Sequence, residues 1–399
     1  MDLDIYDTYY TMDNHTFGLN ASLGKLSECK QIFDRHPTID ISRDHEYAFR
    51  YSCFNGHIEV AKWLHEMKPT IDISTDNEFA FRYSCANGHI EMAQWLLEIN
   101  QTIDLSADNE FAFRYSCENG HIDMAKWLIE MKPTINISAE EEYAFRYSCA
   151  RGHIEMAEWL LEIKPSIDIS AFNDRAFRHS CGNGHIEVAK WLLEMKPTIE
   201  ISADCDYVFR FSCANGHIEM AKWLLEMKPT IDISACDEFA FRHSCDSGHI
   251  EVAKWLHEMK PTIDISADDE LAFRHSCANG HIEMSTWLLE MKPTINIRAK
   301  NDEAFRNSCF HNKIATWLIT LCDEYYCTAE GTCLVAIKPT YQQDIIIDDP
   351  CCICYETSEC ITDCAHVVCK TCFAKLDIKK CPLCRGEIKN LFTGNGWMG

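Results

Sequence analysis

The sequence predicts an all-α solenoid followed by a small zinc-stabilised domain at the C-terminal end. Two observations carry this prediction. The first is a tryptophan that recurs every 32 residues from Trp63 to Trp287. The second is a series of eight cysteine and histidine residues between Cys351 and Cys384. The first predicts repeating helical units, and the second predicts bound metal.

The 32-residue period runs through most of the chain. It is carried by these tryptophans: Trp63, Trp95, Trp127, Trp159, Trp191, Trp223, Trp255 and Trp287. Trp317 follows after 30 residues, and a glycine in the same register extends the period backward to Gly24. A period of 20 to 50 residues indicates a solenoid whose units pack only against their neighbours. We therefore predict ten units: a degenerate first, eight regular, and a last one shortened around Asn312.

Each unit is predicted to contain two helices, as residues 75–106 illustrate. The first helix, Glu78–Ala86, places Phe81 and Cys85 on one face and allows an ion pair between Glu78 and Arg82 four residues later. The sequence Asn87-Gly88-His89 is expected to end this helix.

The second helix of the same unit is predicted over Ile90–Glu98. Its packed side would carry Ile90, Ala93 and Leu97, with Trp95 beside them. In most units the pair Lys-Pro, such as Lys68-Pro69, ends this helix because a proline ring cannot continue it. The β-branched residues 70–74 are then expected to form an extended connector.

Residues 79–98 resemble the ankyrin repeat. Phe-Ala-Phe-Arg, Ser-Cys-Ala, Asn-Gly-His and Leu-Leu stand where that family has Thr-Pro-Leu-His, Ala-Ala, Asn-Gly-His and Leu-Leu. The resemblance covers about three-quarters of the chain. The sequence of the repeat also resembles that of ankyrin proteins of giant DNA viruses of protists. It implies an ankyrin-type solenoid that binds a protein substrate through its loop tips and first helices. Because Phe172, Asp174 and Arg175 make one unit unlike its neighbours, these residues on the concave side are the candidate substrate-binding residues.

A cysteine recurs in nine of the ten units, and in eight of them a histidine follows it after four residues, as Cys85 and His89 do. One such pair supplies only two metal ligands, and stacked repeats are too far apart for a disulfide or a shared ion. We therefore predict that the cysteines pack as small hydrophobic residues and that the histidines hydrogen-bond the turn. Catalysis by these pairs is not expected.

The C-terminal cysteines and histidine have the spacing of a two-zinc domain. The ligands are Cys351, Cys354, Cys364, His366, Cys369, Cys372, Cys381 and Cys384. Since Cys364 and His366 are too close to complete a tetrahedron alone, we expect interleaving. One ion would bind the first, second, fifth and sixth ligands, and the other ion would bind the remaining four. Cys352 and Cys360 are spare.

This order of ligands resembles the RING finger, a small zinc-stabilised α+β domain. The resemblance implies a ubiquitin ligase, with ubiquitin and a ubiquitin-conjugating enzyme as partners and two structural Zn²⁺ as cofactors. The docking positions of the family fall here on Ile353, Leu376, Pro382 and Leu383, and its linchpin arginine falls on Arg385. The alternative is a non-catalytic ankyrin adaptor in which the finger mediates protein binding or dimerisation.

The net charge and the cysteine content indicate which compartment and which classes of partner to expect. The formal net charge of −25 opposes binding to nucleic acid, whose phosphates it would repel. The same charge fits either a basic protein surface or the solubility of a long array. A disulfide framework would need an oxidising compartment, yet residues 1–14 lack a signal peptide and no apolar run suggests a membrane span. We therefore expect the cytoplasm, which would be the host cytoplasm for a viral protein.

Four segments follow from these patterns. They are an N-terminal arm with a degenerate capping repeat at residues 1–42, ankyrin-like repeats at 43–320, a capping segment and linker at 321–348, and the RING-type finger with a C-terminal tail at 349–399.

Overall fold

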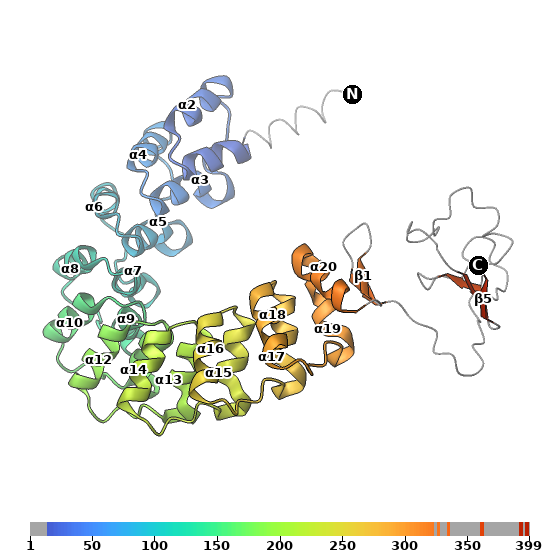
Figure 1. Cartoon of the computed structure of the whole chain (residues 1–399). Helices are drawn as coiled ribbons and strands as arrows, with labels where there is room; N and C mark the ends of the chain where they lie inside the picture. Colours follow the sequence, from blue (N-terminus) through green and yellow to red (C-terminus); the bar gives the residue numbers. More distant parts are fainter. Residues whose placement is uncertain are drawn as a thin grey trace. The chain divides into compact units, whose positions relative to one another are not determined.

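The computed structural model of the chain describes residues 14–322, 325–327, 333–335, 360–362, 391–393 and 396–398 (Figure 1). The chain forms two compact units, Met1–Ile201 and Ser202–Gly399. Within residues 14–322 every regular element is a helix, so the all-helical solenoid predicted from the period is confirmed there.

In the first unit, a helix over residues 14–22 precedes eleven helices that alternate between two layers (Figure 1). Their bounds are α2 (Leu26–Arg35), α3 (Arg43–Phe54), α4 (Ile58–Met67), α5 (Thr75–Ala86), α6 (Ile90–Ile99), α7 (Ala107–Glu118), α8 (Ile122–Met131), α9 (Ala139–Ala150), α10 (Ile154–Ile163), α11 (Ala171–Gly182) and α12 (Ile186–Met195). The first helices of the repeats, such as α5, α7 and α9, form one layer. The second helices, such as α6, α8 and α10, form the other.

The second unit continues the same alternation and then adds strands. Its helices are α13 (Ala203–Ala214), α14 (Ile218–Met227), α15 (Ala235–Asp246), α16 (Ile250–Met259), α17 (Ala267–Ala278), α18 (Ile282–Met291), α19 (Ala299–Asn307), the 3₁₀ turn η1 (Ser308–Phe310) and α20 (Asn312–Leu321). Its strands are β1 (Tyr325–Cys327), β2 (Cys333–Val335), β3 (Cys360–Thr362), β4 (Leu391–Thr393) and β5 (Gly396–Met398). Strands β1 and β2 pair antiparallel, and β3, β4 and β5 form an antiparallel sheet in that order.

In each first helix of a regular repeat, the second to fourth residues are in the left-handed conformation. In α5 these are Asp76, Asn77 and Glu78, with φ angles of 54°, 58° and 63°. Aspartate and asparagine tolerate this conformation better than most residues. Arg82 stabilises the turn, because its Nε donates to the carbonyl of Asn77 at 2.6 Å and its Nη2 donates to that of Asp76 at 3.0 Å.

This turn overturns one sequence-based expectation. The predicted ion pair between Glu78 and Arg82 within the helix is wrong, because Glu78 lies in the left-handed turn that precedes regular helical geometry. Arg82 instead donates through Nη1 to the carboxylate of Asp108 in the next repeat, at 2.8 Å. The arginine therefore joins two repeats.

The Gly-His pair ends each regular first helix and connects it to the next repeat. Gly88 has a φ of +76° and closes a Schellman motif, in which its N–H donates to Cys85 and the N–H of His89 donates to Ser84. A Cβ atom on Gly56 would lie 2.5 Å from Nδ1 of His89. The absence of a side chain on one repeat's glycine therefore makes room for the next repeat's imidazole. His89 Nε2 also hydrogen-bonds the carbonyl of Phe54 at 3.1 Å, which confirms that the histidine bonds a turn.

A second polar contact crosses most of these junctions. The asparagine before the glycine donates to a carbonyl of the preceding repeat, as Asn87 does to Phe54 at 2.8 Å. Two of the regular junctions lack this asparagine: Ser247 replaces it at one, and at the other Arg151 donates to the buried carboxylate of Glu118 at 2.9 and 2.6 Å. Tyr143 donates to the other oxygen of Glu118. Glu118, Tyr143 and Arg151 therefore form one hydrogen-bonded cluster across this junction.

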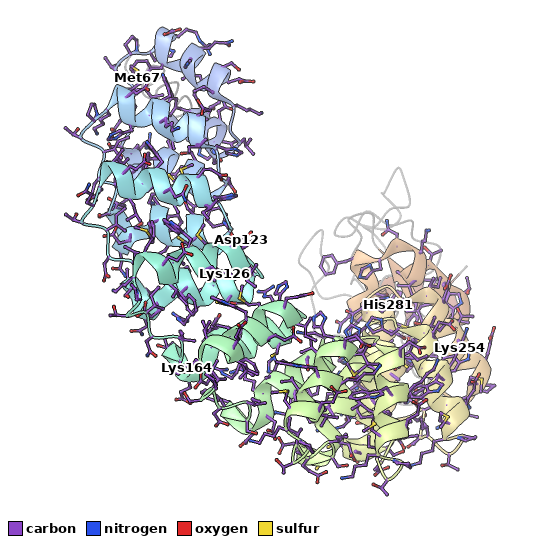
Figure 2. The ribbon with its side chains drawn as sticks, turned by 90° about the vertical axis from the view of Figure 1, so that its left-hand side faces the viewer. Met67, Asp123, Lys126, Lys164, Lys254 and His281 are labelled. Carbon is purple, nitrogen blue, oxygen red and sulfur yellow. The ribbon has the colours of Figure 1, made fainter. Side chains whose placement is uncertain are left out.

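The second helices are amphipathic. In α8, Met124 and Ala125 are buried, whereas the flanking Asp123 and Lys126 are exposed, and Figure 2 shows both charged side chains on the surface. The predicted start at Ile90 in α6 is confirmed, but the predicted packed face is shifted. Met92, Ala93 and Leu96 are buried, while Ile90 and Leu97 are only half-buried, because the face against the first helix follows positions 92, 93 and 96.

The connectors consist of two tight turns instead of the extended segment predicted. Ile71 N–H donates to Lys68 and Thr75 N–H donates to Asp72, while Ile71 and Ile73 are buried between these turns. Helix α6 ends at Ile99 although Gln101 stands where most repeats have proline. The turn and its buried isoleucine therefore end the helix without help from proline.

Phenylalanine and tryptophan form the core between repeats. Phe49, Phe81, Phe113 and Phe145 are fully or almost fully buried. Each contacts the tryptophan of the following repeat, as in Phe81 with Trp127, at a centroid separation of 6.4 Å. The tryptophan period thus marks the surface on which each repeat packs against the one before it.

The shortened last repeat keeps this junction. The 3₁₀ turn Ser308–Phe310 replaces the usual Asn-Gly turn, and His311 occupies the space beside Gly280. Beyond it, Tyr325 is 3% exposed, stacks on Phe305 at 4.1 Å and donates to Asp302 at 2.9 Å. Tyr325, which belongs to the segment predicted to be a cap, therefore covers Phe305, the buried phenylalanine of the last repeat.

Candidate protein-interaction surface

The first helices of residues 43–150 present a continuous row of aromatic side chains, here called the aromatic ladder. Within a helix, two rings four residues apart stack, as Phe111 and Tyr115 do at 4.0 Å. Between helices, the rings contact at slightly larger separations, such as 4.9 Å from Tyr83 to Phe111. The members of the ladder are Tyr47, Tyr51, Phe79, Tyr83, Phe111, Tyr115, Tyr143 and Tyr147.

The ladder is partly accessible. Apart from Phe111, which is 7% exposed, its rings are half-buried. Half-buried tyrosine and phenylalanine offer large apolar areas with little side-chain entropy to lose, a composition typical of protein-binding surfaces. A shorter row with Tyr207, Phe211, Phe239 and His243 occupies the first helices of the second unit.

A column of buried arginines lies beside the ladder. Arg50, Arg82 and Arg114 each stack over the aromatic residue of the following repeat, with the guanidinium 4.7–4.9 Å from the ring centroid. We call the first residue of each left-handed turn the tip residue. In three places a tip aspartate of the following repeat completes the arginine's contacts, namely Arg50 with Asp76, Arg82 with Asp108 and Arg242 with Asp268.

The repeat at residues 171–182 departs from this arrangement. Its tip residue is Phe172, which is 48% exposed and lies over the guanidinium of Arg146 at 4.4 Å. Arg175 takes the place of the usual aromatic residue, donates through Nη2 to the hydroxyl of Tyr147 at 2.9 Å and lies 5.9 Å from the Phe172 ring. Aromatic and charged residues have thus exchanged positions.

Two of the three predicted substrate-binding residues therefore lie together at the end of the aromatic ladder. Phe172 contacts Arg146, Arg175 contacts Tyr147, and Arg175 also lies over the ring of Phe172. Asp174 is less available, because it is half-buried and its carboxylate accepts a hydrogen bond from Ser170 at 2.5 Å. Arg146 and the ladder were not among the residues predicted from sequence, although aromatic residues spaced four apart and repeated at the 32-residue period mark the ladder.

This end of the ladder is locally basic. Burial, and then the charge of Arg175, lowers the pKa of the Arg146 guanidinium. Burial likewise lowers the pKa of His179, with Arg175, Arg178 and Arg146 adding to the effect. The cluster is therefore a concentration of positive charge within an acidic protein.

The repeat cysteines do not form a reactive site. Cys85, Cys117 and Cys149 are fully buried, and burial raises the pKa of each thiol. A buried thiol with a raised pKa is a poor nucleophile and a poor metal ligand. The prediction that these cysteines pack as hydrophobic residues is confirmed, and in the described residues no group of three or more histidine, cysteine, aspartate or glutamate side chains could hold a metal ion.

The predicted zinc ligands, Cys351, Cys354, Cys364, His366, Cys369, Cys372, Cys381 and Cys384, all lie outside the residues that the structure describes. The same holds for the predicted docking residues Ile353, Leu376, Pro382 and Leu383 and for Arg385.

A small cavity beside Tyr47 has a volume of 130 Å³, below the roughly 300–1,000 Å³ typical of ligand pockets. The helices described here are too short or too polar to span a bilayer.

Comparison with known proteins gives one family. A sequence profile described as ankyrin repeats (3 copies) matches residues 48–140, 113–208 and 209–301. Among solved structures, the crystal structure of the human ASB11 ankyrin repeat domain matches at 15% sequence identity and a TM-score of 0.39. That match covers 52% of this chain and 96% of the other. No curated protein matches the sequence.

Proposed function

The chain belongs to the ankyrin-repeat family, and from this premise we propose that it is a RING-type ubiquitin ligase whose repeats recruit a protein substrate. Ankyrin repeats indicate a role in protein–protein interaction. The ligase activity is the further step, and it rests on the C-terminal segment.

The observation that carries the proposal is the spacing of the eight C-terminal ligands. Seven thiols and one imidazole form a donor set that fits two tetrahedral zinc ions. With four protein ligands each, the ions would leave no position for a catalytic water, so their role would be structural. They would hold a segment too short to build a hydrophobic core of its own.

The residues between the ligands support conjugating-enzyme docking. Ile353 and the pair Pro382-Leu383 lie between close pairs of cysteines, and Leu376 follows Cys372 by four residues. The resemblance to RING fingers assigns these apolar residues to the surface that binds a ubiquitin-conjugating enzyme. Arg385, directly after the last ligand, would bridge that enzyme and ubiquitin through its planar set of donors.

The mechanism would be orientation without a covalent intermediate. Docking of the charged conjugating enzyme would hold its thioester toward a substrate lysine, which lowers the entropic part of the barrier. The repeats would supply the lysine by binding the substrate protein, and the aromatic ladder is the surface best suited to that contact.

The alternative is an ankyrin adaptor without ligase activity. In that case the finger would only bind a partner or dimerise, while the repeats tether one protein. The half-buried aromatic ladder favours protein binding equally under both hypotheses.

An assay of ubiquitin-chain formation separates the two. The purified full chain would be incubated with ubiquitin, activating enzyme, ATP and a panel of conjugating enzymes, without added substrate. The ligase hypothesis predicts chain formation on the protein itself with at least one conjugating enzyme, and inactivity with all of them would favour the adaptor.

Two variants refine this test because neither removes a zinc ligand. Ile353→Ala should weaken binding of the conjugating enzyme, whereas Arg385→Ala should slow ubiquitin discharge with binding largely intact. Both should retain two zinc ions. Normal chain formation by both variants would remove these residues from the proposed mechanism.

A further inference from the structure

Arg146 has a buried donor without an acceptor. Its side chain is 4% exposed, and its Nε and Nη2 donate to the carbonyls of Glu141 and Glu140 at 2.7 and 2.8 Å. Its Nη1 is buried and has no hydrogen-bond partner in the part of the chain that the structure describes. A buried charged donor left unpaired costs stability unless something else binds it.

Other repeats show what is missing. The Nη1 atoms of Arg82 and Arg242 donate to the tip aspartates Asp108 and Asp268 at 2.8 and 2.9 Å. Arg274 keeps an acid even though its following tip residue is Lys300, because Glu303 pairs with it. At Arg146 the tip residue is Phe172, which has no acceptor to offer.

The position of Phe172 is unfavourable for the stability of the fold in two respects. Its φ is 58°, a left-handed conformation that is unfavourable for a bulky residue. Nearly half of its surface remains exposed to solvent. An exposed aromatic residue in a strained turn, above an arginine with one unpaired donor, is better suited to an external contact than to internal packing.

The surrounding charges favour an external carboxylate. Arg175 places a second guanidinium against the Phe172 ring, and its repulsion of Arg146 would be relieved by an anion. Several nearby acids already have partners: Glu142 accepts from Ser138, Asp174 accepts from Ser170, and Glu118 accepts from Arg151. Glu141 is exposed and acts on Arg146 through its charge. Glu140 accepts from Asn109. A carboxylate from another molecule can therefore satisfy Arg146 without displacing these contacts.

We propose that this repeat binds an aspartate or glutamate side chain of a partner protein, whose carboxylate takes the place on Arg146 that a tip aspartate occupies on Arg50, Arg82 and Arg242. Phe172 turns aside to admit it and packs on apolar atoms of the partner, next to Tyr147. This inference rests on the part of the proposed function in which the repeats recruit a protein, and it defines the chemistry of the recognised segment.

The test uses the full chain and a random 12-residue peptide library displayed on phage, selected against the wild-type protein. Phe172→Asp is the central variant, because aspartate is the tip residue in several other repeats and adopts the same turn there. It should pair internally with Arg146, raise the denaturation midpoint and lower the affinity for the selected peptides at least tenfold. The selected peptides should share an aspartate or glutamate, and its change to asparagine or glutamine should weaken binding to a similar extent.

Asp108→Asn provides a matched control, since it removes a tip acid from a neighbouring repeat and should leave peptide affinity unchanged. A selection that yields no peptide sensitive to Phe172→Asp would overturn the proposal, as would selected peptides that tolerate loss of their acidic residue. Because no ubiquitin component is present, these outcomes do not depend on ligase activity. A failed chain-formation assay would likewise leave this binding result intact.

Discussion

Replacing Gly56 with alanine tests the contact between glycine and histidine that joins successive repeats. The added methyl has two separate costs. The backbone φ of +74° costs about 1–2 kcal/mol for a residue with a Cβ atom. The Cβ atom would also lie 2.5 Å from Nδ1 of His89, so the imidazole must move. Such overpacking costs about 1–3 kcal/mol, which gives a total of about 2–5 kcal/mol.

A double-mutant cycle separates these two costs. In a His89→Ala background the clash is absent, and Gly56→Ala should cost only the backbone part of about 1–2 kcal/mol. Because long repeat arrays do not unfold in two states, the free energy should be measured by hydrogen exchange of the amides in α3 to α6. If Gly56→Ala costs the same free energy in both backgrounds, the close contact between Gly56 and His89 does not contribute to stability.

The position of the imidazole gives a second measurement for the same variant. Burial lowers the pKa of His89, although its hydrogen bond to Phe54 opposes that shift. Displacement toward solvent in Gly56→Ala should therefore raise the pKa of His89 toward its value in unfolded chains, about 6.5. Titration of the imidazole ring by NMR would detect this, and an unchanged pKa would mean that the ring has not moved.

Three further predictions concern metal, thiols and pH. Metal analysis of the full chain should find two zinc ions. Cys369→Ser should lose zinc, whereas Cys352→Ser should retain both ions. Removal of zinc by a chelator should leave the helical circular dichroism of the repeats unchanged. Among the described cysteines, Cys205 and Cys236 are exposed and should react rapidly with a thiol reagent in the native protein, whereas the buried repeat cysteines should react only on unfolding, as peptide mapping would show. Stability should decrease as the pH is lowered, because burial lowers the folded-state pKa of several histidines and the unfolded chain therefore binds more protons below about pH 6.5. The stability that comes from these neutral buried histidines is complete above that pH and is lost as the pH falls through the folded-state pKa values. A urea-unfolding midpoint that does not change between pH 8 and pH 5 would contradict this. The histidines concerned include His89, His121, His153, His217 and His249.

The period and the turn chemistry were sufficient to predict the helix pairs. Trp95 marks the register, and Asn87-Gly88 marks the end of a helix through a local rule that tertiary packing reinforces. The left-handed turn at Asp76–Glu78 could not be predicted in the same way. Those residues also fit a first helical turn, and the decisive contacts come from Arg82 and from the next repeat.

The candidate binding site was predictable only in part. An unusual residue in an otherwise regular repeat drew attention to Phe172 and Arg175. The unpaired donor of Arg146 lies in the preceding repeat, 26 residues earlier than Phe172 in the chain. Its importance depends on which repeat supplies the acid for each arginine, and that pairing follows from three-dimensional packing.

The bond between Arg151 and Glu118 limits how the array can change in length during evolution. Neighbouring repeats are so alike that recombination within the coding sequence could remove one of them and keep the 32-residue register. Loss of residues 139–170 would bring Asn183 to the place of Arg151 and Arg175 to the place of Tyr143. Glu118, which is 5% exposed, would then exchange Tyr143 and Arg151 for these two residues as hydrogen-bond donors. Loss of a repeat at a junction that uses asparagine therefore preserves the type of contact, as Asn279 with Asp246 shows even for an acid in this register, whereas loss at Arg151 changes the donors that Glu118 meets.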